Sequence, residues 1–245
     1  MADSDLERAV QEALDQPPAR VRPLLLADGR RFWLKRVEHL AGRMRLQKGD
    51  PARSFAAERE GIRALEAQDL PVAGVEMEGP GWIVLPDAGP VLPQVVADAG
   101  RDEAEKLHAM ASAGQALARL HLAGMVHGRP AVRDICWDGA QVRFIDLERF
   151  RQARPGGFRQ AMDLMVLAQS SFVLWPGETR WLEAAFAGYR ATGPRGALSR
   201  AARLAFLLAP SGWLARAVLA LRPQSRELRA LTLVLPWLRR QGRPR

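Results

Sequence analysis

Hydrophobic and polar positions in the first third of the chain predict a helix followed by a β-hairpin. Leu6, Val10 and Leu14 recur at helical spacing, so a short amphipathic helix is expected over residues 4–16. Two β-rich runs follow in "VRPLLLADGRRFWLKRVE", on either side of Asp28-Gly29. That dipeptide suits a tight turn with positive φ, which indicates that the two runs pair as a hairpin.

The next apolar stripe predicts a helix between residues 51 and 70 that carries an inward acid. Glu58 lies three residues after Phe55 and four before Ile62, so it shares the apolar face of this helix. A buried carboxylate is costly unless it is paired. Lys35, in the second run of the hairpin, is the obvious partner.

A Pro/Gly-rich segment after the short predicted strand 82–85 divides the chain near Asp87. We expect a smaller part over residues 1–87 and a helical part over residues 88–245. The helical part opens with a helix over residues 103–123.

Later patterns predict one more hairpin and further helices. "ICWDGAQVRFIDLE" turns at Asp138-Gly139, and "FRQAMDLMVLAQSSFVL" is an apolar helix with one inward acid, Asp163. "WLEAAFAGYRA" is predicted to be a further helix. The predicted fold class is therefore α+β.

Composition fits a globular protein in a reducing compartment. The chain has 245 residues, of which 48% are hydrophobic, enough to bury a substantial core. Its single cysteine, Cys136, excludes a disulfide framework within the chain. The acidic start "MADSDLERAVQEALDQ" is unlike a secretory signal, so we expect a cytoplasmic protein.

The net charge of +9 draws attention to the basic C-terminal tail. Much of the basic excess follows residue 190, and it could serve nucleic acid, anionic lipid or a phosphorylated substrate, or reflect an arginine-rich proteome. Nucleic acid is disfavoured because aromatic and basic residues do not interleave. The longest uncharged run, Leu204 to Ala215, has 12 residues and is too short to span a bilayer. The tail could instead lie in the headgroups of an anionic leaflet, peripheral on the inner face of the cytoplasmic membrane, or pack on the helical part.

One stretch carries a family resemblance. "ARLHLAGMVHG" and the later "FID" follow a strand lysine and a helix glutamate in the order typical of a kinase. The chain thus resembles the protein-kinase-like superfamily, in particular its branch of lipopolysaccharide core heptose and Kdo kinases and aminoglycoside phosphotransferases. The resemblance implies a bilobal fold with a reduced β-rich N-lobe, a mostly helical C-lobe and a catalytic loop within residues 120–150.

The resemblance also implies a site for ATP and Mg²⁺. Lys35 would hold the α and β phosphates, oriented by Glu58. Asp146 would bind magnesium, and Asp134 stands where the family has its second metal ligand, usually asparagine.

Further residues would support the same site. His127 and Asp163 match residues that hold the catalytic loop in the family. The segment from Leu85 to Asp87 would contact adenine.

Two departures from the family pattern bear on activity. The position two residues after His127 and five before Asp134, where a catalytic aspartate is expected, holds Arg129. A guanidinium does not deprotonate near neutral pH and cannot act as a base. Arg129 could bind the transferred phosphoryl group or an acidic substrate, or form a structural salt bridge to Glu148 or Asp134.

The second departure is the start of the chain, "ERAVQEALDQPPAR", which has no glycine where a phosphate-binding loop is expected. Two functions remain. The first is an ATP-dependent phosphotransferase that transfers the γ-phosphoryl group to a hydroxyl, with a lipopolysaccharide core sugar or related glycolipid as acceptor. The second is a pseudokinase scaffold without transfer activity that binds a protein or membrane partner.

Overall fold

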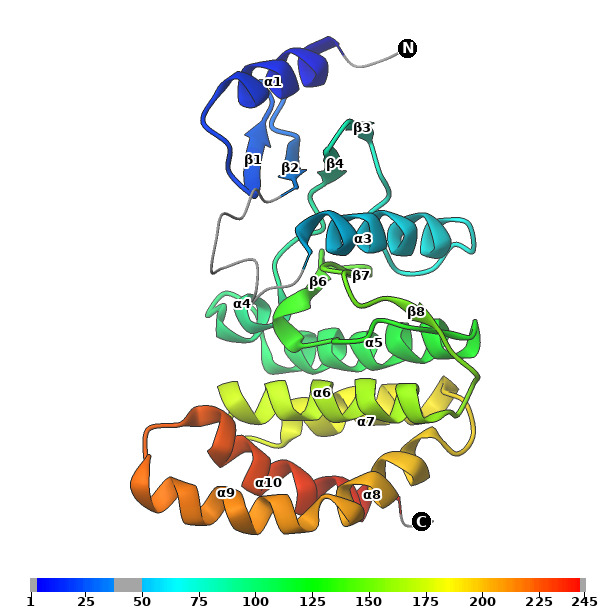
Figure 1. The fold of residues 1–245 in the computed structure, drawn as a ribbon, viewed down its shortest axis with the longest axis vertical. Coiled ribbons are helices and arrows are strands. Elements are labelled where there is room, and N and C mark those ends of the chain that lie inside the picture. The colour runs from blue at the N-terminus through cyan, green and yellow to red at the C-terminus, as the bar shows by residue number, and fades with distance from the viewer. Residues whose placement is uncertain (1–3, 38–49, 243–245) are drawn as a thin grey trace.

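The computed structural model describes residues 4–37 and 50–242 and has a small β-rich part stacked on a larger helical part (Figure 1). The β-rich part contains α1 (Ser4–Asp15), β1 (Val21–Leu25), β2 (Arg31–Arg36), α3 (Pro51–Glu66), β3 (Met77–Gly79) and β4 (Trp82–Pro86). The rest contains α4 (Leu92–Ala97), α5 (Glu103–Leu122), β5 (Met125–Val126), η1 (Val132–Asp134), β6 (Ile135–Trp137), β7 (Val142–Phe144), β8 (Arg151–Gln152), α6 (Phe158–Leu174), α7 (Arg180–Thr192), α8 (Ala197–Leu207), α9 (Ala209–Leu221) and α10 (Arg226–Gln241). The predicted α+β, two-part fold is confirmed.

The four-stranded antiparallel sheet, ordered β1-β2-β4-β3, has two differently covered faces. Because side chains alternate along a strand, Phe32 and Leu34 of β2 face outward, where Leu6 and Val10 of α1 cover them. Lys35 lies on the opposite face, beside Ile83 of β4 in the strand register. The helix at the start of the chain thus covers the outer side of the sheet and leaves Lys35 facing the helical part.

Helix α3 forms where the apolar stripe predicted it. Asp50 caps its N-terminus by accepting a hydrogen bond from the main-chain N–H of Ala52 at 3.1 Å, and Pro51 occupies the first turn. Glu58 lies on the buried side with only 4% of its surface exposed. The inward orientation predicted for Glu58 is therefore confirmed.

The helical part is a stack of helices that ends in the C-terminal tail (Figure 1). Helices α5 and α7 pack along their length, and α6 and α10 also contact each other. Trp237 of α10 packs edge-on against Phe172 and Phe186, with ring centroids 6.1 and 4.7 Å apart. Helix α10 therefore follows the packing alternative considered for the tail.

Several short elements were not predicted because they have too few residues to show a period. They are β3, α4, β5, η1 and β8. Main-chain bonds fix the segments around them: Trp137 donates to the Pro90 carbonyl at 2.9 Å, and Phe144 donates to the Pro71 carbonyl at 2.9 Å. The sheet ends at Pro86, and the domain boundary near residue 87 stays a prediction.

A buried carboxylate holds the loop that follows β5. Asp163 of α6 accepts hydrogen bonds from the main-chain N–H groups of His127 and Gly128 at 2.9 and 3.0 Å. Its Oδ2 also lies 3.2 Å from Nε2 of His121, whose Nδ1 lies 2.7 Å from the Tyr189 hydroxyl. This network joins α5, α6 and α7 to the loop at residues 127–129, which is the support implied for Asp163.

Gly128 is required at the turn of this loop. Its φ is +87°, and an added Cβ would lie 2.2 Å from the carbonyl oxygen of Arg149. A side chain would therefore meet both backbone strain and a collision with main chain. The glycine lets the loop pass close to the segment that follows Asp146.

We predict that Asp163→Asn destabilises the protein by about 2–4 kcal/mol, because hydrogen bonds to a charged group are worth roughly 1.5–3 kcal/mol each. Three donors point at the Asp163 carboxylate, and an amide would turn an N–H toward one of them. Denaturant unfolding measures the change in the free energy of unfolding.

The matched control is Asp15→Asn at the exposed end of α1, expected to change stability by less than about 0.5 kcal/mol. Tyr189→Phe should fall between the two, because it removes a single hydrogen bond at His121. Equal stability of the Asp163 and Asp15 variants would contradict the role given to this network.

Candidate functional site

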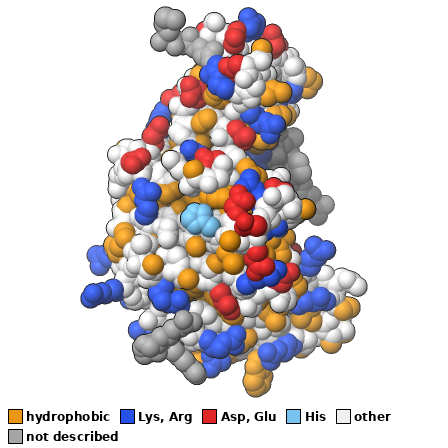
Figure 2. Space-filling view, turned by 180° about the vertical axis from the view of Figure 1, so that it is seen from behind, with side chains coloured by type: hydrophobic (Ala, Val, Ile, Leu, Met, Phe, Trp, Pro, Cys, Tyr) orange, Lys and Arg blue, Asp and Glu red, His pale blue; other side chains and the backbone are white. Residues whose placement is uncertain are grey.

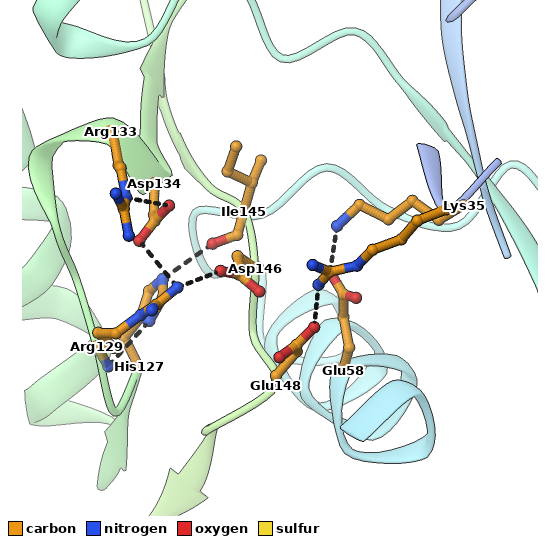
Figure 3. Close-up of polar contacts among 10 residues, drawn as sticks. Lys35, Glu58, His127, Arg129, Arg133, Asp134, Ile145, Asp146 and Glu148 are labelled. Atoms are coloured by element: carbon orange, nitrogen blue, oxygen red, sulfur yellow. Dashed lines mark hydrogen bonds and ion pairs between the residues drawn. The ribbon is translucent and has the colours of Figure 1, made fainter. Parts of the chain in front are cut away.

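Charged side chains from the two parts of the molecule face one another across a cleft (Figure 3). Lys35 and Glu58 come from the β-rich part. Arg129, Asp134 and Asp146 come from the helical part. All five were singled out from the sequence pattern, which also indicated Asp87 and Asp163.

Lys35 and Glu58 form the predicted ion pair. The Lys35 ammonium donates to Oε1 of Glu58, and their side chains are 18% and 5% exposed. Burial makes this pair dependent on both partners, because either charge alone would be costly in this place. The pair fixes the position of the lysine at the roof of the cleft.

Asp146 is held by a segment that packs under α3. Its φ is +64°, a left-handed conformation that is uncommon for a residue other than glycine. The next residue, Leu147, is fully buried, and its Cβ would lie 3.1 Å from a Cβ added at Gly61 of α3. The close approach at Gly61 therefore sets the Asp146 carboxylate relative to Glu58, which lies on the same helix.

Asp134 is a nearly buried carboxylate at the end of η1, 6% exposed. Burial, reinforced by the negative charge of Asp146, raises its pKa from 3.8 to about 6, while Arg129, Arg133 and Lys35 act in the opposite direction. Its Oδ2 atom is buried and has no hydrogen-bond partner. This oxygen is therefore available to accept a hydrogen bond or to bind a cation.

Arg129 lies between the two carboxylates (Figure 3). Its Nη2 donates to Oδ2 of Asp146 at 2.7 Å and lies 3.8 Å from Oδ2 of Asp134. Of the salt bridges considered from sequence, the one to Asp134 is present. The one to Glu148 is wrong, because Glu148 pairs with Arg20 instead.

The Arg20–Glu148 ion pair links the two parts of the molecule at the cleft. Arg20 precedes β1, and its carbonyl accepts from the N–H of Arg36, next to Lys35. Sequence reasoning missed Arg20, although it ends the glycine-free stretch that replaces a phosphate-binding loop. A lone arginine before a strand gave no periodic signal.

His127 orients the loop and carries no charge of its own at neutral pH. Its Nε2 lies 3.1 Å from the carbonyl oxygen of Ile145, which can only accept, so Nε2 carries the proton. Its Nδ1 then accepts the N–H of Arg129 at 3.4 Å. Burial lowers the pKa of His127, which favours this neutral form.

Both end residues of the segment implied to contact adenine, Leu85 and Asp87, already make contacts within the protein. Leu85 is 5% exposed and belongs to the main core, while Asp87 accepts from Nε1 of Trp33 at 2.9 Å. The pairing of Trp33 with Asp87 was not predicted from the sequence. The adenine role of this segment stays a prediction.

The carboxylate pair fits a divalent cation. Asp134 and Asp146 together carry two negative charges where Arg129 supplies one positive charge, and Asp134 keeps a buried oxygen without a hydrogen bond. Oxygen ligands of this kind suit magnesium. Within the described part of the chain, no three His, Cys, Asp or Glu side chains gather as a metal site, so two carboxylates would need further oxygen ligands from a nucleotide and water.

Similarity to solved structures is partial. The macrolide 2'-phosphotransferase MphH from Brachybacterium faecium is 16% identical, with a TM-score of 0.48 over 94% of this chain and 97% of that one. A structure of WbdD with the kinase inhibitor LY294002 is 15% identical, with a TM-score of 0.47 over 80% of this chain and 49% of WbdD. WbdD is a bifunctional kinase-methyltransferase, and the chain spans about half of its length. Because these TM-scores lie below 0.5, the two likenesses assign neither activity nor substrate.

Sequence comparison gives a closer relationship. No protein-family model matches the chain. An uncharacterized protein of Haemophilus influenzae is 31% identical over 171 residues, which cover 69% of this chain and 70% of that protein. The chain belongs to the same family as this Haemophilus influenzae protein.

Proposed function

We propose that the protein is an ATP-dependent phosphotransferase that transfers the γ-phosphoryl group to a hydroxyl acceptor. One observation carries the proposal: the Lys35–Glu58 ion pair and the Asp134 and Asp146 carboxylates face one cleft from opposite parts of the fold. Phosphoryl transfer requires the protein mainly to position oxygens and neutralise charge. A cation opposite two carboxylates meets both requirements.

Two cations are available for nucleotide phosphates at the roof of the cleft. Lys35 is held by Glu58 and keeps 18% of its side chain exposed, so its ammonium can contact a phosphate without losing its partner. Arg20 stands at the end of the glycine-free stretch and pairs with Glu148 on the other side of the cleft. We infer that the positive charge of Arg20 takes over part of the phosphate binding that the backbone amides of a glycine-rich loop provide in other kinases.

Asp134 and Asp146 would hold magnesium, which when bound neutralises charge on the phosphate oxygens. The buried Oδ2 of Asp134 gives one ligand, and the left-handed conformation at residue 146 aims the second carboxylate at the same space. A divalent cation balances both carboxylates, whereas Arg129 balances one. Occupation of the site would therefore release Arg129 from the acid pair.

Released from the acids, Arg129 can contact the phosphoryl group in transfer. Its side chain is 37% exposed, so its end has room to move, while its main chain is held by His127. Base assistance is typically worth about 10²–10⁴-fold in rate, and a loose transition state needs less of it. Replacement of the catalytic aspartate by arginine thus changes the rate more than the type of reaction.

The proposed acceptor is a sugar hydroxyl of lipopolysaccharide core or a related glycolipid. The resemblance of "LHLAGMVHG" and "FID" to the core-kinase branch supports this choice, and so does a basic, apolar tail that suits an acceptor found at a membrane. A sugar hydroxyl needs little activation when it is well positioned against the γ-phosphate.

A second candidate is a pseudokinase scaffold that binds a protein or membrane partner and transfers nothing. The contact of Arg129 with both acids favours it, because the protein's own guanidinium already stands at the carboxylate pair. In this case the charges of the cleft would serve only to hold the two parts of the fold together. Nucleotide binding and transfer separate the two candidates.

We predict that magnesium-ATP raises the melting temperature, since a ligand at 100 times its Kd stabilises the folded state by about 2.7 kcal/mol. Radiolabelled ATP with core oligosaccharide should then give labelled product. Lys35→Met should remove the shift, because it removes a cation proposed to contact the phosphates. Asp146→Asn should reduce transfer roughly 10²-fold or more, because it removes a proposed magnesium ligand.

The matched controls are Lys106→Met and Asp15→Asn, which make the same two substitutions outside the cleft. They should leave the thermal shift and the transfer of label unchanged. A shift without transfer to any sugar or lipid acceptor would favour the scaffold. The absence of any shift at millimolar magnesium-ATP would rule out the phosphotransferase.

Arg129→Ala should lower the stability of the metal-free protein by roughly 1–3 kcal/mol, because it leaves two neighbouring carboxylates without their cation. Magnesium alone should restore this stability in the variant and have a smaller effect on the unmodified protein. Denaturant unfolding with and without magnesium makes the comparison.

Arg133→Ala is the matched control, since Arg133 also lies 3.8 Å from Asp134 but is 67% exposed. Because its charge is exposed to solvent, Arg133→Ala should change stability and the response to magnesium much less than Arg129→Ala does. If Arg129→Ala is as stable as the unmodified protein and insensitive to magnesium, Arg129 does not neutralise the acid pair.

Magnesium affinity should fall below pH 6, because the pKa of Asp134 is raised to about 6 and the protonated acid does not bind a cation. The expected loss is roughly tenfold per pH unit below that pKa, as one proton competes with the metal. The same raised pKa makes the metal-free protein lose stability as the pH rises through about 6. Magnesium titrations between pH 5 and 8 by thermal shift test this, and Asp134→Asn should abolish both trends.

A further inference from the structure

Helix α9 and the end of α8 expose an unusual number of large apolar side chains. Among the described residues they include Phe206 (60% exposed), Leu207 (72%), Trp213 (75%), Leu214 (67%) and Leu221 (84%). Only Gly212 and Ala215 of α9 are buried. Scattered exposed leucines are ordinary on a protein surface, but a contiguous group of this kind marks an interaction site.

The exposed residues of α9 form one outward stripe. At 100° per residue, Trp213, Ala217, Ala220 and Leu221 fall on the same side of the helix, with Leu214 at one edge and Arg216 at the other. Helix α8 meets α9 at a bend of 52°, so Phe206 and Leu207 lie close to the beginning of this stripe. No single helix in the described chain is long and apolar enough to cross a membrane, and the bent pair α8–α9 meets the length and composition test only as a pair.

The stretch of chain that contains the stripe is rich in arginine and has almost no acids. Residues 190–245 contain twelve arginines and one acid, Glu227, so this stretch carries +11 in a chain whose net charge is +9. In Figure 2 acidic side chains gather in the upper and middle parts of the molecule, while the lower end carries basic and hydrophobic ones. The positive charge of the protein is thus concentrated where its apolar side chains are exposed.

Basic and apolar groups also meet at a hollow of about 550 Å³ between α8 and α10. Its lining includes Arg203, Phe206, Arg239 and Arg240, and the Arg239 guanidinium lies 5.0 Å from the centre of the Phe206 ring. An anionic headgroup could contact these arginines while the neighbouring apolar residues enter the acyl boundary.

We propose that α9, the end of α8 and the surrounding arginines form a docking surface for an anionic lipid membrane. Tryptophan and leucine on one face of a short helix with basic residues at its edges suit insertion at the headgroup boundary. A second copy of the chain is a poor occupant, because a symmetric contact would bring arginines against arginines. Nucleic acid is disfavoured, since the exposed side chains are mainly aliphatic and offer few stacking faces.

The docking surface lies away from the cleft. Helices α5, α6 and α7 stand between the cleft and α9 (Figure 1). Membrane docking therefore does not depend on the proposed phosphotransfer, and each can be measured while the other is absent.

Vesicle co-sedimentation of the full chain, without nucleotide or magnesium, tests the proposal. The protein should bind phosphatidylcholine vesicles that contain phosphatidylglycerol, bind phosphatidylcholine alone much more weakly, and lose binding as salt is raised. Trp213→Glu with Leu214→Glu should reduce partition at least about tenfold, since both side chains are removed from the apolar stripe and replaced by repelled charge. Arg203→Gln with Arg239→Gln should weaken binding to the anionic vesicles alone.

Leu25→Glu with Leu122→Glu is the matched control, because both leucines are exposed (69% and 51%) and lie outside the docking surface. This control should bind vesicles as the unmodified protein does, and all variants should keep the same unfolding midpoint. The proposal is overturned if no vesicle binds, or if the Trp213 and Leu214 variant binds as well as the control. Self-association in sedimentation that the same variant abolishes, without vesicle binding, would assign the surface to a second copy instead.

Discussion

The repulsion between the Asp134 and Asp146 carboxylates is the constraint on which the candidate site depends. The two acids carry one negative charge more than the single guanidinium between them can balance. Burial raises the pKa of Asp134, and the negative charge of Asp146 raises it further. Arg129 relieves the repulsion only in part, because it donates a hydrogen bond to Asp146 alone and leaves Oδ2 of Asp134 without one.

The surrounding fold fixes the positions of the two carboxylates and of the loop that carries Arg129. Asp163 accepts hydrogen bonds from the main chain of the loop that carries Arg129. The main-chain N–H of Arg129 donates to neutral His127. The segment that carries Asp146 packs under α3, where Leu147 lies against Gly61. This packing positions Asp146 relative to the helix that carries Glu58. Because these supports are buried, they hold the two carboxylates in place while the end of Arg129 stays partly exposed. The excess negative charge is therefore fixed at one position, where a bound cation would neutralise it.

Sequence patterns predicted the parts of the site that have a period and missed those that depend on tertiary contact. Glu58 could be predicted to point inward because it shares an apolar stripe. Lys35 could be predicted as its partner because it lies in a strand with a clear β pattern. The hydrogen-bond partner of Arg129 is Asp146, which was not among the partners considered from sequence. The choice between Glu148 and Asp134 could not be made either, since it depends on where Arg20 reaches across the cleft. Likewise, the His121–Tyr189 contact joins residues 68 apart through packing of α5 on α7, which leaves no local signal.

The C-terminal tail shows why both alternatives considered for it were needed. Helix α10 buries Trp237 in the helical core, whereas α9 turns Trp213 outward, so one basic, leucine-rich composition serves two different environments. If α9 lies on a membrane, the cleft stands on the far side of α5, α6 and α7 from the lipid. The docking surface would then set the orientation and local concentration of the protein, without touching the acceptor. An acceptor sugar would have to project well beyond the headgroups to reach Arg129, which favours the extended glycan of a glycolipid over a group at the bilayer surface.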